Sequence, residues 1–220
     1  MTSLATRQVN PEYLDGAPDE AAFGGLRDLR RLNHFFGGRR ILRSLLRRLR
    51  PGARFSWLDV GAASGDLADI VRADFPGAHV VCLDASVRNM SQASGSRVAA
   101  QALQLPFGVR SFDYVFCSLF LHHFDDMEIV KLLASMNEIA RRGVVVMDLM
   151  RAQFSYHFLP VTRPVFGWHP LTIQDGQASV AAGFRLRELE QLAALAGLEQ
   201  VRMRRHWPWM RLSLIANRLQ

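Results

Sequence analysis

Lysine, cysteine and long apolar runs are scarce in this sequence. Lys131 is the single lysine among 27 basic residues, so nearly all of the positive charge is arginine. Both cysteines, Cys82 and Cys117, stand inside apolar runs, which is typical of buried reduced thiols rather than of a disulfide framework. No apolar segment approaches the roughly 18 residues that span a bilayer, and the polar N-terminus lacks the core of a signal peptide. These absences predict a cytoplasmic protein without a transmembrane segment.

Positive charge is in excess, with 27 basic against 20 acidic residues and a net charge of +7. Such a balance is compatible with attraction to nucleic acid, an anionic membrane or an acidic substrate, but a coding bias towards arginine accounts for it equally, so the charge is discounted as a clue to function. Arginines line the polar face of an expected helix over 39–50: Arg39, Arg40, Arg43, Arg47, Arg48 and Arg50. Because a solvated face is the ordinary role of such a pattern, contact with anionic lipid or RNA is the less favoured alternative.

Strand and helix patterns alternate along most of the chain. Strands are expected over 55–60, 80–84, 97–102, 112–118, 144–149, 199–205 and 212–216, and helices over 64–74, 87–94, 125–141 and 187–196. Continuous apolar strands that alternate with helices indicate a parallel sheet covered on both faces. The expected fold class is therefore α/β, with a doubly wound, mostly parallel, seven-stranded sheet.

Two segments fall outside this alternation. Residues 1–50 combine an arm over 1–20 with two helices, over 20–36 and 39–50, and are expected to form a helical cap on a main domain over 51–220. Residues 151–184 contain three prolines and several aromatic residues. A long insertion among compact elements predicts a lid or substrate-binding segment.

The stretch "LDVGAASGDLA" runs from a strand into a glycine-containing turn. Gly61 follows the strand and Gly65 lies at the next helix start, so the backbone can approach a ligand and present N–H groups to it. Asp84 ends the second strand, where a carboxylate would accept hydrogen bonds from both hydroxyls of a ribose. The pattern predicts a nucleoside cofactor, with a tight turn that binds nothing as the alternative.

An acid, Asp59, followed by G-A-A-S-G resembles the class I S-adenosylmethionine (SAM) methyltransferase motif, an acid followed by G-x-G-x-G, with Ala63 replacing the middle glycine. "VVCLDAS", "ALQLPFGVRSFDYVFCSLFLHHFDD" and "RRGVVVMDLMR" follow in the order of that family, so the resemblance covers about residues 55–150. Two flanking stretches, "LRDLRRLNHFFGGRR" and "DGQASVAAGFRLRELEQLAALAGL", resemble small bacterial enzymes of quinone and polyketide pathways in the methyltransferase-11, or UbiE-like, branch. Gln101 departs from the family, since many relatives carry an acid there for the adenine amino group; its carbonyl would accept the same hydrogen bond.

The resemblance implies SAM as cofactor, S-adenosylhomocysteine (SAH) as product, and no metal. The implied cofactor contacts lie in the turn, at the end of the second strand and around Gln101: Asp59, Gly61, Ala63, Gly65, Asp84, Ala85, Gln101, Ala102, Leu103 and Ser118. His122 and His123 follow the fourth strand and Asp148 ends the fifth, at the edge where open α/β sheets bind ligands. One histidine would accept the proton of a phenol and Asp148 would orient it; packed or solvated histidines and a capping carboxylate are the alternatives.

Aromatic and histidine residues at two places are candidates for the wall of an acceptor pocket. They belong to the end of the first helix and to the insertion: His34, Phe35, His157, Trp168 and His169. Packing of the insertion against the sheet would equally account for each of them alone.

The expected reaction is O-methylation of a phenolic, polyketide or quinone-like hydroxyl on a small acceptor, with C-methylation next. A nucleic-acid methyltransferase ranks second, because no Asn/Asp-Pro-Pro-aromatic motif follows the fourth strand and Cys117 has no neighbouring proline. A non-catalytic partner protein with this fold is a third possibility, which Ala63 and Gln101 allow. A nicotinamide-dependent enzyme is disfavoured because the sequence lacks the third glycine of the dinucleotide fingerprint. Metal catalysis is disfavoured because no His/Asp cluster has the spacing of metal ligands. A monomer or a homodimer is expected.

Overall fold

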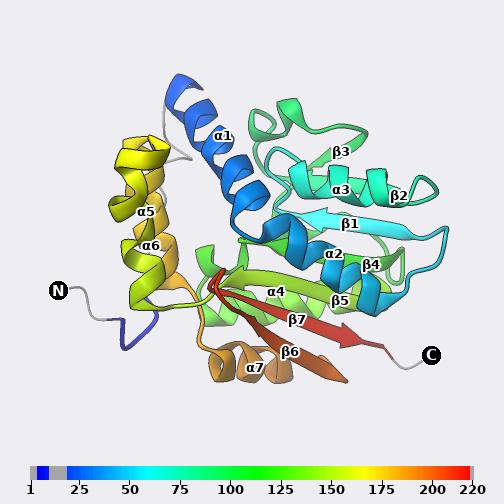
Figure 1. Ribbon diagram of the computed structural model, residues 1–220. Coiled ribbons are helices and arrows are strands. Elements are labelled where there is room, and N and C mark those ends of the chain that lie inside the picture. Colours follow the sequence, from blue (N-terminus) through cyan, green and yellow to red (C-terminus); the bar gives the residue numbers. More distant parts are fainter. Residues whose placement is uncertain (1–3, 10–18, 219–220) are drawn as a thin grey trace.

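The computed structural model describes residues 4–9 and 19–218, and it contains a seven-stranded sheet in the order β3-β2-β1-β4-β5-β7-β6 (Figure 1). The strands are β1 (Ser56–Val60), β2 (His79–Asp84), β3 (Ser96–Ala99), β4 (Phe112–Ser118), β5 (Ala140–Leu149), β6 (Val201–His206) and β7 (Arg211–Asn217). Strands β1 to β5 pair in parallel, and β7 pairs antiparallel with β5 and β6. The predicted mostly parallel α/β sheet is confirmed.

Helices cover both faces of the sheet because the strands are apolar on both sides. α2 (Gly38–Leu49) and α3 (Asp66–Asp74) pack on the face that carries Trp57 and Phe116. α4 (Asp126–Ile139) and α7 (Leu186–Leu195) pack on the face that carries Leu58 and Val115. Trp57 and Leu58 are neighbours in β1, so their division between two clusters follows from the alternation of side chains along a strand.

The strand order reverses between β1 and β4, and this switch point fixes where loops gather. β2 and β3 lie on one side of β1, whereas β4 and β5 lie on the other. Three short 3₁₀ turns follow the carboxyl ends of β2, β3 and β4: η2 (Asn89–Gln92), η3 (Ala102–Gln104) and η4 (Leu121–His123). Open α/β sheets bind ligands in the crevice at such a point.

The predicted insertion folds into two helices, α5 (Gln153–Phe166) and α6 (Pro170–Ala182), which stand with α1 (Asp19–Phe35) beyond the carboxyl edge of the sheet (Figure 1). Asp28 joins α1 to α6, because its Oδ2 accepts hydrogen bonds from the His169 backbone N–H at 2.9 Å and from the Thr172 hydroxyl at 3.0 Å. Arg31 donates to the Phe166 carbonyl at 2.8 Å. The three helices therefore form one layer.

Several predicted boundaries shift. The helix expected over 125–141 ends at Ile139, and β5 begins at once with Ala140, which pairs with Phe112. The helix expected over 87–94 is the η2 turn, and the strand expected over 97–102 ends at Ala99. The arm expected over 1–20 lies mostly outside the described residues. Within the described ranges, no helix is both long and apolar enough to cross a membrane.

Candidate functional site

A cavity of about 870 Å³ lies between the carboxyl edge of the sheet and the layer of α1, α5 and α6. Its wall is largely apolar, as ligand pockets usually are, with polar groups at a few places. The polar side chains that line it come from the sheet edge, from α5 and from α6: Asp84, Ser86, Asn89, Gln101, Ser118, His122, His123, Ser155, Thr172, Asp175, Ser179 and Arg211. The cavity thus has one wall made by the loops after the strands and another made by helices.

The turn after β1 is held close to the end of β2. Gly61 has φ +68°, and a Cβ placed on it would lie 2.2 Å from Phe120, so only glycine fits under that ring. Ala63 adopts φ +46° and donates its backbone N–H to Asp84 Oδ2 at 2.9 Å. Asp84 Oδ1 accepts the Ser86 N–H at 2.8 Å. The structure therefore brings Gly61, Ala63 and Asp84 together on the cavity wall, as predicted.

Two motif residues, Asp59 and Gly65, lie outside the cavity wall. Asp59 lines a separate pocket of about 20 Å³ beneath the turn, which has room for roughly one water molecule. Burial, together with the nearby Asp66 carboxyl, raises the pKa of Asp59 well above its usual range. A Cβ on Gly65 would lie 2.8 Å from Ala93, so this glycine faces the chain after η2. Both residues support the turn from behind.

The end of the cavity near β2 and β3 carries the residues predicted to hold a nucleoside. Ala85, Gln101 and Ala102 line it, whereas Leu103 does not line the cavity and is 39% exposed. Within the described part of the chain, Ser118 Oγ and Asn89 Oδ1 are buried without a hydrogen-bond partner. Two such atoms on a cavity wall fit a polar ligand, because buried polar groups are nearly always hydrogen-bonded. Asn89 was missed by sequence reasoning, although its place just after the second strand was a usable signal.

His122 and Asp148 form a buried pair at the edge of β4 and β5. His122 Nδ1 lies 2.6 Å from Asp148 Oδ1. Asp148 also accepts backbone N–H groups from Phe120 at 3.2 Å, Leu121 at 2.9 Å and Leu149 at 2.7 Å. Burial would raise the pKa of this carboxyl, but His122 and the backbone hydrogen bonds outweigh that effect and lower its pKa. The predicted neighbourhood of a histidine and Asp148 is therefore present.

His123 and α6 complete this end of the cavity. The His123 ring stacks on His122 with centroids 4.4 Å apart, and both rings line the cavity. α6 packs against η4 and brings the nearly buried Asp175 to the same cavity. Asp175 was missed, because the sequence assigned no helix to the insertion and so no inward face to it.

The five predicted acceptor residues do not line the cavity. Phe35 is exposed and His34 packs on its ring. Trp168 is buried behind the wall, stacked on Phe166, and His169 caps the start of α6, with its ring accepting the Leu171 N–H at 3.3 Å. His157 is exposed on α5. The aromatic rings that line the cavity are instead those of Phe36, Phe120, Phe124, Phe154, Phe158 and Trp209.

Comparison with known proteins agrees with this geometry. Residues 58–147 match the family model described as "Methyltransferase domain", a match that runs from β1 to β5 and includes the turn, Asp84 and His122. A search of curated proteins found no match.

Solved structures share the fold. A plantazolicin methyltransferase, BpumL, in complex with SAH has a TM-score of 0.69 at 13% identity over 93% of each chain. Magnesium protoporphyrin IX methyltransferase from Synechocystis, with bound SAH, has a TM-score of 0.57 at 17% identity over 83% of this chain and 84% of its own. A Nostoc punctiforme protein described as a proposed O-methyltransferase has a TM-score of 0.63 at 18% identity over 84% of this chain. This chain spans 56% of that protein, less than two thirds of its length.

The sheet order and the cavity at its switch point define the class I SAM-dependent methyltransferase fold. Residues 58–147 match the methyltransferase-11 family model, and the chain shares this fold with the solved SAM-dependent methyltransferases.

Proposed function

We propose that the chain transfers a methyl group from SAM to a hydroxyl of a small, largely apolar acceptor of the phenolic, polyketide or quinone-like class. One observation carries the proposal: a single cavity joins the Asp84 end to an apolar end that contains the buried His122–Asp148 pair. Its volume is near the top of the range of about 300–1,000 Å³ typical of ligand pockets, which suits a cofactor together with an acceptor. In this proposal residues 19–50 act as the cap and 151–184 as the lid.

The residues at the first end fit SAM. Asp84 lines this end of the cavity at the end of β2, and its carboxylate would accept hydrogen bonds from the ribose. Gln101 and Ala102 would flank the adenine, and the unpartnered oxygens of Ser118 and Asn89 offer further hydrogen-bonding positions among the described residues. When bound, SAM supplies a methyl group already activated by a sulfonium centre.

The chain's own contribution at the second end is to position the acceptor, exclude water and take its proton. Asp148 has a lowered pKa, so it is ionised at neutral pH and can only accept hydrogen bonds. The proton between the pair therefore resides on His122 Nδ1, so Nε2 is the ring nitrogen that would act as general base toward the acceptor. Phe36, Phe154 and Phe158 give the cavity the apolar wall that an aromatic acceptor requires.

Calorimetric titration with SAM and SAH, with NADH as control, tests the cofactor part of the proposal. We expect micromolar binding of SAM and SAH, and none of NADH. Asp84→Ala should weaken SAH binding by about 1–3 kcal/mol, the usual cost of losing hydrogen bonds to a charged group. Asp126→Asn alters an exposed carboxylate on α4, outside the cavity wall, and should leave binding unchanged. Failure of the wild-type protein to bind SAH would refute the proposal.

The acceptor class is tested by incubating the protein with SAM and a panel of phenols, hydroxyquinones and aromatic polyketides. Mass spectrometry would detect the added methyl group, and NMR of the product would distinguish a methoxy group from a C-methyl group. Methylation confined to amines or to nucleic acid would contradict the proposed acceptor.

A further inference from the structure

Arginines from α2 and β6 gather on one face of the molecule. α2 carries Arg40, Arg47 and Arg48 on its exposed side and has no acidic residue. In β6, Arg202 and Arg204 pair with Ile215 and Ser213, and opposite residues of an antiparallel pair point to the same face. Ile215 packs in the core beneath α2, so these two arginines lie on the α2 side of the sheet.

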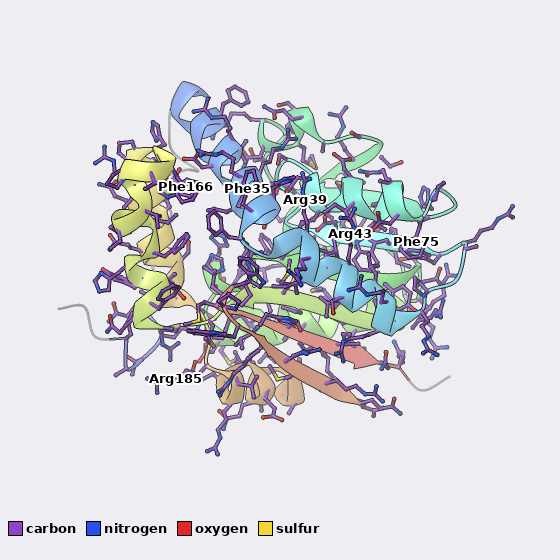
Figure 2. All side chains as sticks on the ribbon, viewed as in Figure 1. Phe35, Arg39, Arg43, Phe75, Phe166 and Arg185 are labelled. Atoms are coloured by element: carbon purple, nitrogen blue, oxygen red, sulfur yellow. The ribbon has the colours of Figure 1, made fainter. Side chains whose placement is uncertain are left out.

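The two sets of arginines are close enough to act on one group. Burial, followed by the charges of Arg204 and Arg48, lowers the pKa of His206 to about 4. The same side of the molecule appears in Figure 2, where Phe35, Arg39 and Arg43 face the viewer along α1 and α2. Arg43 is paired with Asp74, at 2.7 Å, and is left out of this basic face, which we define as Arg40, Arg47, Arg48, Arg202 and Arg204.

Exposed apolar side chains mark the mouth of the cavity next to this basic face. Phe154 lines the cavity and is nevertheless 56% exposed, so it stands at an opening. Its ring centroid is 6.1 Å from that of Trp207, which is 70% exposed. Val161 and Val165 are 73% and 80% exposed and lie seven and eleven residues after Phe154, on the same stripe of α5. We define the apolar rim as Phe154, Val161, Val165 and Trp207.

The basic face and the apolar rim adjoin through the turn between β6 and β7. Trp207 precedes Pro208 and Trp209, both of which line the cavity. Trp209 packs against Gly37, immediately before α2, because a Cβ on that glycine would lie 2.3 Å from the Trp209 ring. The apolar rim is therefore connected to the start of α2 by the residues at the mouth of the cavity and by the contact between Trp209 and Gly37.

We propose that this surface docks on a membrane that contains anionic lipid, with the basic face against the headgroups and the apolar rim inserted beside them. Arginine is attracted to an anionic leaflet, and tryptophan favours the level of the headgroups. Valine side chains have no π-face on which a nucleic-acid base could stack, so the rim fits lipid better than RNA. An apolar acceptor dissolved in the bilayer would then reach the cavity without crossing water. The docking itself does not depend on the proposed methyl transfer.

Sedimentation of the full chain with phosphatidylcholine vesicles, with and without phosphatidylglycerol, tests the docking. We expect binding to the anionic vesicles that weakens as salt rises. The triple variant Arg40→Gln/Arg47→Gln/Arg48→Gln should bind at least tenfold more weakly, since each arginine near an anionic surface contributes about fivefold. The triple variant Arg110→Gln/Lys131→Gln/Arg187→Gln removes the same charge, two of the three residues lying on α4 and α7 on the other face, and should bind as the wild type does.

Insertion of the rim has its own readout. Vesicles should shift the tryptophan emission to shorter wavelength, and the shift should be lost in Trp207→Phe. Equal loss of binding in both triple variants would overturn the proposal, because attraction would then follow net charge alone. Binding of single-stranded RNA without binding of vesicles would also overturn the proposal. The same holds if Val161→Ser/Val165→Ser changes the oligomeric mass but leaves vesicle binding intact, because the rim would then be a contact between copies of the chain.

Discussion

At the scale of single residues, the His122–Asp148 pair makes the sharpest prediction about catalysis. His122→Gln removes the lone pair that would take the acceptor's proton, and general bases contribute about 10²–10⁴-fold to rate. Asp148→Asn should also lower kcat, because an amide can hold the ring in the wrong tautomer. Both variants should bind SAH as the wild type does. The measurement is kcat against pH on whichever acceptor the panel identifies.

His157→Gln is the matched control for this prediction, since His157 is an exposed histidine on α5 outside the cavity wall. If His122→Gln keeps its kcat and pH profile, alignment of the acceptor alone carries the reaction. His123→Gln then separates stacking from proton transfer: it should affect KM more than kcat, because the 2.6 Å contact with Asp148 is made by His122, whereas His123 stacks on the His122 ring.

Ala63 makes a second prediction at this scale, one that concerns stability. Its φ of +46° is left-handed, a conformation that costs a residue with a Cβ roughly 1–2 kcal/mol. Ala63→Gly should therefore raise the free energy of unfolding by about 1 kcal/mol, measured in urea, without weakening SAH binding. Ala62 lies beside it without a positive φ, so Ala62→Gly should lower the free energy instead. A fall in stability for Ala63→Gly would contradict this account.

Sequence alone could identify the turn but not which of its residues reach the cavity. The spacing of Gly61, Ala63 and Asp84 was sufficient for those three. Asp59 was predicted to contact the ligand because it belongs to the motif. However, it lies two residues after Trp57 in β1, so both side chains point to the face covered by α2 and α3. Counting that alternation would have placed it beneath the turn.

At the scale of elements, His206 in β6 makes the stability of the fold depend on pH in a predictable direction. His206 Nε2 lies 2.7 Å from Ser213 Oγ, and its pKa is lowered from 6.5 to about 4. Between these two pH values the unfolded chain binds a proton that the folded chain does not, so stability falls as pH falls. Urea unfolding across this window should show a steeper loss for the wild type than for His206→Asn. The variant His79→Asn, which changes an exposed histidine, should behave as the wild type; identical slopes for all three would contradict the prediction.

The strands were predictable as elements, whereas α5 and α6 were not. β1, β4 and β5 each contain an apolar run, such as residues 144–147 in β5, as expected of a buried parallel strand. α5 contains Pro160 and Pro164, which normally interrupt a helix, and it is held by contacts distant in sequence, such as Phe36 on Phe158 with centroids 4.9 Å apart. Without that helix the inward face of the insertion was unknown, so Trp168 was chosen for the wall in place of Phe158.

At the scale of the whole molecule, Arg151 joins three separate parts of the chain. It is buried, and its guanidinium donates to the Leu4 carbonyl at 3.1 Å, to the Gly183 carbonyl at 2.6 Å and to the Glu188 carboxylate. These partners belong to the N-terminal segment, to the end of the insertion and to α7. Burial would raise the pKa of Glu188, but Arg151 and the Arg185 N–H outweigh it and lower the pKa, so the pair is ionised at neutral pH.

Arg151→Met should lower the free energy of unfolding by about 3 kcal/mol, because removing one partner leaves buried acceptors and a carboxylate without their donor. Arg43→Met is the matched control: Arg43 pairs with Asp74 at the surface, where such pairs contribute less than about 1 kcal/mol. Urea unfolding gives both values, and hydrogen exchange should show earlier opening of residues 4–9 in Arg151→Met alone. Equal losses in the two variants would mean that Arg151 acts as an ordinary surface charge and that the N-terminal segment is held by its other contacts, among them the Arg7 hydrogen bond to the Phe124 carbonyl.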